Sequence, residues 1–315
     1  EATTGPLGQG TAVAVGMAMA ERALAARFNR PGFDIVNHRT YALVSDGDLM
    51  EGISAEAGSL AGHLHLGRLT YLYDANEVSL DGPTSLSFST EDVAKRYEAY
   101  GWHVQTVPDG DTDTEALDRA MQAAKEEKDR PSFIVIKTTI GYGAPNKKGT
   151  AKAHGSPLGQ EEAALAKKAL GGDPAKTFEI DPEALTEWRL AKERGRKLHE
   201  GWREKLKDYE RAHPKLAREF SEALEGRLPQ GWDRDLPVFK AGEKIATRVA
   251  GGKVLNALAA KVPALIGGDA DLSVSTGTGL EKEKSFDGRT GEGRNIHFGV
   301  REHAMGACAN GMAYH

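Results

Sequence analysis

Two short polar segments have the composition of a site for a metal ion and a diphosphate. Residues 46–48 (Asp-Gly-Asp) directly follow an apolar run, and residues 74–76 (Asp-Ala-Asn) close the next one. A Mg²⁺ ion that is bound to a diphosphate needs only one or two protein oxygens, because phosphate oxygens and water complete its octahedron. The Asp46 carboxylate, the Asn76 side-chain oxygen and the Val78 carbonyl would supply such a set.

The same residues also have a simpler interpretation. An Asp-Gly pair after a strand is a common turn, so Asp46 and Gly47 could be ordinary turn residues. Gly47 lacks a Cβ, however, and its backbone could therefore approach a phosphate closely. Ligands in open parallel sheets bind beyond the carboxyl ends of the strands, so the site requires both polar segments to lie at one edge of such a sheet.

The first 170 residues alternate between patterns typical of strands and of helices. The run 133–137 (FIVIK) is continuous and β-branched, which is typical of a parallel strand covered on both faces. Strands that alternate with helices predict an α/β fold, a parallel sheet with helices on both faces. The predicted strands are 41–45, 69–73 and 133–137, and the predicted helices are 10–28, 50–64, 90–100 and 113–128.

Residues 181–228 have a different pattern. Apolar residues at helical spacing stand among dense Lys, Arg and Glu, which predicts a helical connector whose charges form a solvated face. A new α/β unit then begins, with predicted helices at 242–261 and from about Glu302, and predicted strands at 264–266 and 295–300. We therefore predict a first domain over 1–180, a connector over 181–236 and the truncated beginning of a second, similar domain over 237–315.

Composition excludes several classes of protein. The 39% hydrophobic and 28% charged content of the 315 residues is typical of a soluble globular protein. A formal net charge of −5 without a basic stripe argues against nucleic-acid binding, and no apolar run reaches membrane length. The single cysteine, Cys308, excludes an intrachain disulfide framework and favours the reducing cytoplasm. The chain starts at Glu1 without a methionine and stops at His315 within a predicted helix, so we expect both ends to be cut.

The spacing of the polar segments is similar to the signature of thiamine-diphosphate enzymes, which runs from Gly-Asp-Gly to a later Asn. Ser45 stands where that family usually has glycine. Six blocks, in order along the chain, then resemble transketolases. They are Gly5-Pro6-Leu7-Gly8-Gln9-Gly10, 46–54 (DGDLMEGIS), 79–82 (SLDG), 140–143 (IGYG), 154–159 (HGSPLG) and 299–302 (GVRE).

This resemblance implies a role for individual residues. Thiamine diphosphate would be bound by Gly5, Pro6, Leu7, Gly47, Asn76, Ile140, His154 and Asp271, and Mg²⁺ (or Ca²⁺ or Mn²⁺ in its place) by Asp46, Asn76 and Val78. The sugar-phosphate substrate would be bound by His154, Arg248 and Ser275. Glu302 and His154 would be catalytic, with Glu302 at ring nitrogen N1′ of the aminopyrimidine, and Glu51 and Glu56 would lie at a dimer interface. The first domain would bind the diphosphate and the metal, and the second the pyrimidine.

The activity that the resemblance implies is that of a cytoplasmic, homodimeric transketolase of the pentose phosphate pathway. Such an enzyme reversibly transfers a two-carbon ketol unit from a ketose phosphate to an aldose phosphate, through a carbanion on thiamine diphosphate. A deoxyxylulose-phosphate synthase or phosphoketolase is a related alternative, and a non-catalytic cofactor-binding or dimer-scaffold fragment is another. A nicotinamide dehydrogenase is disfavoured, because Val13 stands where the dinucleotide fingerprint requires its third glycine.

Three of these residues also have an interpretation that involves no catalytic or binding role. Glu302 opens a helix, where a carboxylate complements the helix dipole with no catalytic part. His154 lies in a loop rich in lysine and glycine, where an isolated histidine is usually solvated. Arg248 shares its helix with Lys244 and Lys253 and could be one more solvated charge.

Overall fold

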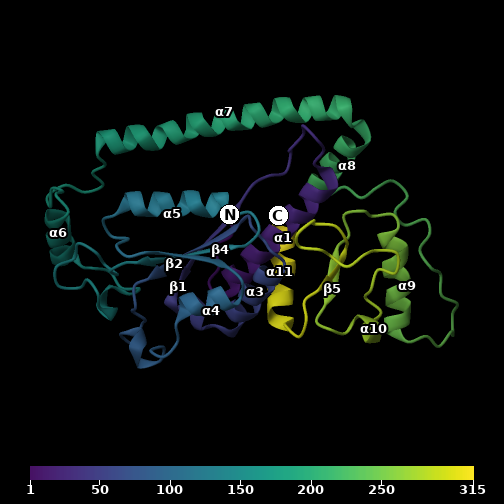
Figure 1. Cartoon of the computed structure of the whole chain (residues 1–315), viewed down its shortest axis with the longest axis horizontal. Coiled ribbons are helices and arrows are strands. Elements are labelled where there is room, and N and C mark those ends of the chain that lie inside the picture. Colours follow the sequence, from purple (N-terminus) through teal and green to yellow (C-terminus); the bar gives the residue numbers. More distant parts are fainter.

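A four-stranded parallel sheet organises the first half of the chain (Figure 1). The structure is a computed structural model that describes residues 1–315. The strands are β1 (Thr40–Ser45), β2 (Leu69–Ala75), β3 (His103–Val107) and β4 (Ser132–Lys137), and they are arranged in the order β1-β2-β4-β3. Ser45 is paired with Asp74, so β1 and β2 end level with each other and the polar segments that follow them leave the sheet at one edge.

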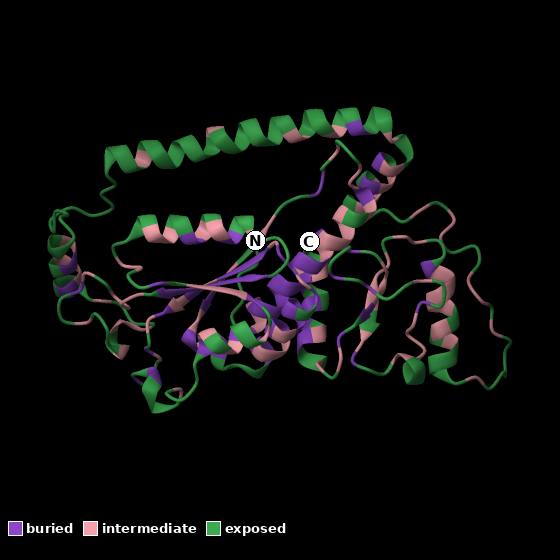
Figure 2. Ribbon diagram, in the orientation of Figure 1, coloured by how far each residue is buried: buried purple, intermediate pink, exposed green.

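Helices cover both faces of this sheet, as the sequence predicts. One face carries Tyr71, Tyr73 and Phe133, which pack in a core with α1 (Gln9–Phe28), α3 (Gly52–His63) and α4 (Val93–Ala99). The other carries Ile134 and Ile136, which pack against α5 (Thr114–Glu126). All residues of β4 except Lys137 are buried, because side chains alternate between two covered faces (Figure 2).

The connector is helical, as predicted, and largely exposed (Figure 2). After α6 (Gln160–Ala169) it consists of the 31-residue helix α7 (Pro182–Ala212) and of α8 (Pro214–Leu224). Only the C-terminal part of α7 is anchored to the body: Trp202 Nε1 donates to the Ile35 carbonyl at 2.9 Å, and the Tyr209 hydroxyl donates to the Phe28 carbonyl at 2.6 Å. None of the helices combines the length and the apolar composition that crossing a bilayer would require.

The second α/β unit contains α9 (Thr247–Ala259), β5 (Gly267–Asp269), α10 (Ser273–Thr276), β6 (Asn295–His297) and α11 (Glu302–Tyr314). The two strands are paired in parallel. Helix α11 packs closely on α1, because two glycines allow the backbones to approach. A Cβ on Gly16 would lie 2.1 Å from the Cys308 carbonyl oxygen, and a Cβ on Gly311 would lie 2.0 Å from that of Val13.

Several predicted boundaries are wrong. Residues 46–48, which lie between the predicted strand 41–45 and the predicted helix 50–64, form the first turn of a short helix, α2 (Asp46–Met50), and the predicted helix 50–64 is interrupted at Glu51. The strand predicted at 264–266 is displaced to Gly267–Asp269, where glycine allows the strands to pair: a Cβ on Gly268 would lie 1.7 Å from the Ile296 carbonyl oxygen. The predicted strand 295–300 ends at His297, and the predicted helix 242–261 begins only at Thr247.

Candidate functional site

The buried carboxylate of Asp46 joins the two polar segments at the edge of the sheet. Asp46 is only 3% exposed. The Tyr73 hydroxyl donates to Oδ1 at 2.6 Å, and the backbone N–H of Glu77 donates to Oδ2 at 3.0 Å. Burial raises the pKa of Asp46, and these two hydrogen bonds oppose the rise. One acidic side chain at the start of α2 therefore fixes the segment that follows β2.

Asp48 joins this site to the block at the start of the chain. Its Oδ1 accepts from the Gly8 backbone N–H at 2.9 Å, while its Oδ2 accepts from the Ser45 N–H and hydroxyl, both at 2.8 Å. A Cβ on Gly47 would lie 3.1 Å from Leu7 Cδ1, so Leu7 lies beside the glycine that we expect to approach a phosphate. The structure thus brings Leu7 and Gly47 together, and Asp48 connects their segments.

The segment after β2 presents oxygen atoms in a strained turn. Asn76 donates from Nδ2 to Asp74 Oδ2 at 3.1 Å, and its Oδ1 accepts from the Val78 N–H at 3.1 Å. Glu77 has a φ of 62°, which is unfavourable for a residue with a Cβ. The Val78 carbonyl accepts no hydrogen bond within the chain. An oxygen without a donor, close to a buried carboxylate and an amide oxygen, fits a hard cation such as Mg²⁺.

The proposed oxygen set differs from the usual clusters of metal-binding side chains. Nowhere in the chain do three or more His, Cys, Asp or Glu residues form such a cluster. The set at the sheet edge consists of one carboxylate, one amide and one carbonyl, which is enough only if a diphosphate and water provide the other oxygens.

The segment after β4 contains Ile140 and His154. The Gly149 N–H donates to the Ile140 carbonyl at 2.8 Å, and a Cβ on Gly141 would lie 2.8 Å from the Cβ of Ala153. His154 is half-buried, and its Nδ1 is buried without any hydrogen-bond partner. A buried imidazole nitrogen without a partner is costly, and a ligand that bonds to it would remove that cost.

The second unit brings Arg248 and Ser275 to one cavity. This cavity has a volume of about 500 Å³ and lies between α9 and residues 273–281, with Lys253 and Ser273 also in its lining. Asp271 is exposed and has a φ of 66°, so it lies in a strained turn between β5 and α10. The predicted substrate residues Arg248 and Ser275 are therefore close together.

Glu302 is the first residue of α11 and is exposed. The N-terminus of this helix is attached to α3 of the same chain: Glu56 Oε2 accepts from the Ala304 N–H at 2.9 Å, and Arg301 Nη2 donates to Ser59 Oγ at 3.1 Å. Glu51 is exposed between α2 and α3, and its Cβ would lie 2.7 Å from a Cβ on Gly8. Glu302 forms no hydrogen bond or ion pair with Asp46 or His154.

One chain does not assemble all the predicted residues. The loops that follow β2 and β4 lie beside α6 at one end of the molecule, whereas α9 and α10 lie at the opposite end (Figure 1). Asp46, Asn76 and His154 are therefore remote from Arg248 and Ser275.

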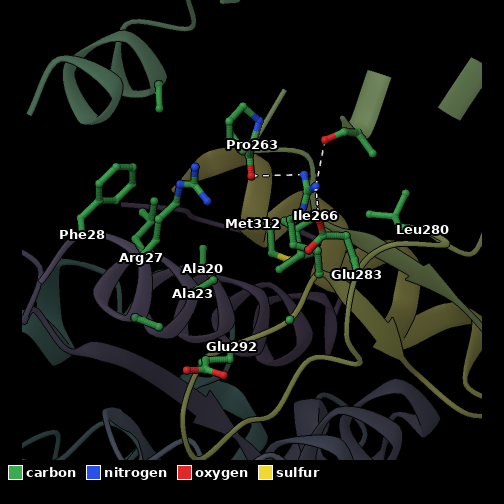
Figure 3. A pocket seen from close by; sticks show the side chains of 18 of the residues that line it. Ala20, Ala23, Arg27, Phe28, Pro263, Ile266, Leu280, Glu283, Glu292 and Met312 are labelled. Atoms are coloured by element: carbon green, nitrogen blue, oxygen red, sulfur yellow. Dashed lines mark hydrogen bonds and ion pairs between the residues drawn. The ribbon is translucent and has the colours of Figure 1, made fainter. Parts of the chain in front are cut away.

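Another cavity, larger than the one beside Arg248, lies elsewhere. It has a volume of about 1340 Å³ and lies between α1, α8, the second unit and the end of α11 (Figure 3). Phe28, Ile266 and Met312 line it, and Arg294 forms an ion pair with Glu283 at 2.7 Å in its wall. None of the predicted site residues contributes to this lining.

The contacts of Asp48, Tyr73 and Asp74 were not predicted from the sequence. Asp48 and Asp74 stand within the polar segments themselves, which is a usable signal. Tyr73 gives no such signal, because an aromatic residue in a buried strand is ordinarily only a packing residue.

Comparison with known proteins identifies the family. The model of the transketolase thiamine diphosphate binding domain matches residues 1–229, and that of the transketolase pyrimidine binding domain matches residues 243–315. The chain is 54% identical to a transketolase of Geobacillus stearothermophilus and 48% identical to that of Bacillus subtilis, over its whole length and 47% of theirs.

Solved structures agree with this result. The transketolase of Leishmania mexicana superposes with a TM-score of 0.95 at 47% identity, over 98% of this chain and 46% of that one. A Pichia stipitis transketolase in complex with sedoheptulose 7-phosphate gives a TM-score of 0.94 at 40% identity, over 99% of this chain and 47% of that one. The chain spans about half the length of the curated relatives it matches. Its matched domains, its fold and its sequence identity make it a member of the transketolase family.

Proposed function

We propose that this chain forms the cofactor- and substrate-binding part of a transketolase, which transfers a two-carbon ketol unit between sugar phosphates. The observation that carries the proposal is the edge of the sheet, where buried Asp46 holds the segment of Asn76 and Val78 beside Gly47. Names of relatives favour transketolase over deoxyxylulose-phosphate synthase or phosphoketolase. The division into 1–180, 181–236 and 237–315 is part of this proposal.

In this proposal, Asp46, Asn76 and the Val78 carbonyl hold Mg²⁺, or Ca²⁺ or Mn²⁺ in its place. The residues that bind thiamine diphosphate are Gly5, Pro6, Leu7, Gly47, Asn76, Ile140, His154 and Asp271. When bound, this cofactor supplies the carbon nucleophile and the electron sink that ketol transfer requires. The protein supplies binding, orientation and proton positions.

Two residues act on protons. The Glu302 carboxyl holds a proton at N1′ of the aminopyrimidine, which requires a carboxyl with a raised proton affinity. Glu302 is exposed in one chain, so a neighbouring subunit must bury it. His154 donates a hydrogen bond to the substrate oxygen near the reacting carbon, and its Nδ1 has no hydrogen-bond partner within the chain.

The substrate is a sugar phosphate whose phosphate is bound by Arg248 and Ser275. A planar guanidinium can bind two phosphate oxygens at once, which a lysine cannot. Relatives from Pichia stipitis have been solved with xylulose 5-phosphate, sedoheptulose 7-phosphate and fructose 6-phosphate. These complexes support a ketose phosphate as the donor.

A cytoplasmic homodimer would complete the site. Arg248 and Ser275 lie at the opposite end of the chain from Asp46, so the substrate phosphate and the cofactor diphosphate require surfaces of two chains (Figure 1). Glu51 and Glu56 would lie at the interface between them. The same separation favours a second candidate for a chain without a partner, namely a scaffold that binds the cofactor but does not turn over substrate.

Calorimetric titration with thiamine diphosphate, with and without Mg²⁺, tests the proposal. Asp46→Ala should lower the affinity by roughly 2–4 kcal/mol and abolish its dependence on Mg²⁺, because metal and diphosphate bind as one unit. The Asp46→Asn variant keeps the shape of the side chain and one acceptor oxygen, and it replaces Asp46→Ala in this test if the alanine variant unfolds. Asp118→Ala, on the exposed side of α5, is the matched control and should bind as the parent does. Equal affinity in the parent and both Asp46 variants would remove the metal assignment.

A further inference from the structure

The turn segment 270–278, which follows β5 and includes the short helix α10, carries two residues with proposed roles, yet little packing holds it in place. Asp271 and Ser275 both lie in the segment 270–278 and both are exposed. Leu272 and Val274 are exposed as well, by 53% and 98%, and among the apolar residues of the segment only Ala270, at its start, is buried. Asp271 also has a φ of 66°, a conformation that must be stabilised by contacts elsewhere. Hydrogen bonds are therefore the main restraint on this turn.

One side chain closes the turn from both ends. Asp269 is the last residue of β5, and its Oδ1 accepts from the Leu272 N–H at 2.8 Å. Its Oδ2 accepts from the Thr278 hydroxyl at 2.6 Å. The backbone of Asp269 is itself held by the sheet, since its carbonyl accepts from the Phe298 N–H at 3.2 Å. A carboxylate fixed to the sheet thus ties together both ends of the segment that carries Ser275.

The far end of the turn is fixed against α9. A Cβ on Gly252 would lie 2.8 Å from the Gly277 carbonyl oxygen, so the turn passes directly over the helix backbone. Asn256 then donates to the Gly279 carbonyl at 3.1 Å and accepts from the Glu281 N–H at 2.8 Å. The distance between Ser275 and α9 is therefore set by the geometry of this turn.

Four donors without partners line the cavity that results, together with Glu281. Arg248, Lys253, Ser273 and Ser275 face it, and their side chains make no hydrogen bond or ion pair within the chain. Such a set binds an anion only if the hydroxyls and the guanidinium are held at the right separation.

We infer that Asp269 is the positioning residue of the substrate-phosphate site: by closing the turn 270–278 it holds Ser275 opposite Arg248. This inference rests on the proposed function, because it assumes that these two residues bind the phosphate. Asp269 touches neither substrate nor cofactor in this scheme. Its own negative charge opposes anion binding, so its contribution must come from geometry.

Charge and geometry can be separated by two substitutions. Asp269→Asn removes the charge but keeps an oxygen for the Leu272 N–H and an amide that can donate to the Thr278 hydroxyl. Asp269→Ala removes the charge and both hydrogen bonds. A positioning role predicts that alanine weakens phosphate binding and asparagine preserves it, whereas a role through charge alone predicts tighter binding in both.

The experiment is an NMR titration of the ¹⁵N-labelled 315-residue chain with ribose 5-phosphate, with inorganic phosphate and with ribose. For Asp269→Ala we expect about a tenfold rise in the Kd of both phosphates, and for Asp269→Asn a change of less than about twofold. The amide signals of residues 272–278 should shift in the alanine variant before any ligand is added, while those of the first domain stay unchanged. Parent-like binding by Asp269→Ala, or equal weakening by both variants, overturns the inference.

Two further variants test the positioning role and the phosphate site separately. Thr278→Val removes only one of the two hydrogen bonds and should raise the Kd about threefold, which decides the case if Asp269→Ala disrupts the second unit. Parent-like binding by Thr278→Val in that case overturns the inference. Arg248→Ala tests the underlying assignment separately. If Arg248→Ala leaves phosphate binding unchanged, the phosphate site itself is wrong; if it abolishes binding but Asp269→Ala does not alter it, only the positioning role is wrong.

Discussion

The buried carboxyl of Glu21 should make the stability of this chain depend on pH. Glu21 lies in α1, is only 2% exposed, and its Oε1 has no hydrogen-bond partner. Arg68 Nε lies 3.4 Å from that oxygen. Burial raises the pKa of Glu21 from 4.5 to about 7, more than the nearby Arg68, Arg22 and Arg39 lower it, and Asp34 adds a smaller rise. The native state therefore retains a proton that the unfolded chain has already released.

The direction in which the free energy of unfolding changes with pH follows from proton linkage. Between the unfolded and the folded pKa the native state binds more protons than the unfolded state, so the free energy of unfolding falls as pH rises. The stabilisation is complete below pH 4.5 and is lost as pH rises through about 7. A shift of this size corresponds to about 3 kcal/mol in total, of which about 2.5 kcal/mol is lost between pH 5 and pH 8.

Glu21→Gln removes the titration while keeping the shape of the side chain. We expect urea denaturation to give similar stabilities for variant and parent near pH 5, and a variant more stable by about 2–3 kcal/mol at pH 8. Glu115→Gln, at a side chain in α5 that is 89% exposed, is the matched control and should follow the parent at every pH. Stabilities of Glu21→Gln and parent that stay parallel from pH 5 to pH 8 would show that Arg68 keeps Glu21 ionised. A variant that is less stable at every pH would mean that the ion pair contributes net stability.

Three further outcomes are expected. Gly16→Ala should destabilise the chain by about 1–3 kcal/mol or more in urea denaturation, because its Cβ would lie 2.1 Å from the Cys308 carbonyl oxygen; Gly306→Ala, with nothing within 4 Å, should be neutral or slightly stabilising. In an enzyme assembled from complete subunits, the Glu302→Gln variant should bind thiamine diphosphate normally. Hydrogen–deuterium exchange at C2 of the cofactor should be slower by at least about tenfold, because an amide cannot share a proton with N1′. An unchanged exchange rate would mean that Glu302 is only a helix-terminal residue. As a monomer, the 315-residue chain should show at most trace turnover in a coupled assay with xylulose 5-phosphate and ribose 5-phosphate, because its proposed half-sites lie at opposite ends of one chain; turnover by the monomer near that of a full-length relative would contradict this.

Elements with strong local signals were predicted well from the sequence. The helix at 10–28 is formed by small apolar residues on nearly all sides, and it is buried as α1 between the sheet and α11. The strand at 133–137 is confirmed for the same kind of reason, since continuous β-branched residues suit a strand covered on both faces. In both cases the composition of the segment itself determines the structure.

Elements that depend on distant partners were missed or displaced. Strand β3 contains His103, Gln105 and Thr106 and lies at the edge of the sheet, so its polar sequence carries no strand pattern. Strand β5 is Gly-Gly-Asp, which reads as a turn until β6 pairs with it. Gly268 is required there by the closeness of the partner backbone.

The candidate site was predicted as a set of residues but not as an arrangement. The sequence could associate Asp46 with Asn76, because parallel strands end at one edge. It could not indicate that Tyr73 and Glu77 hold the Asp46 carboxylate, or that Arg248 lies at the other end of the molecule. The contacts of Asp46 depend on the pairing of β1 with β2, and the position of Arg248 depends on how the two α/β units pack; no local pattern encodes either.

The contacts of α11 would explain how the two-subunit site that we propose can still be ordered within each subunit. Glu302 opens a helix that Glu56 and Ser59 hold from α3 of the same chain, and that Gly16 allows to pack closely on α1. The first domain therefore fixes the orientation of Glu302, although in our proposal Glu302 acts on a cofactor bound by another subunit. Substitutions in α1 or α3 should consequently impair the neighbouring site rather than the one in their own chain. Mixed dimers that combine a Gly16→Ala chain with an Asp46→Ala chain would distinguish the two cases. If Gly16→Ala impairs the neighbouring site, one of the two sites carries both defects and the other carries none. If Gly16→Ala impairs the site of its own chain, each site carries one defect.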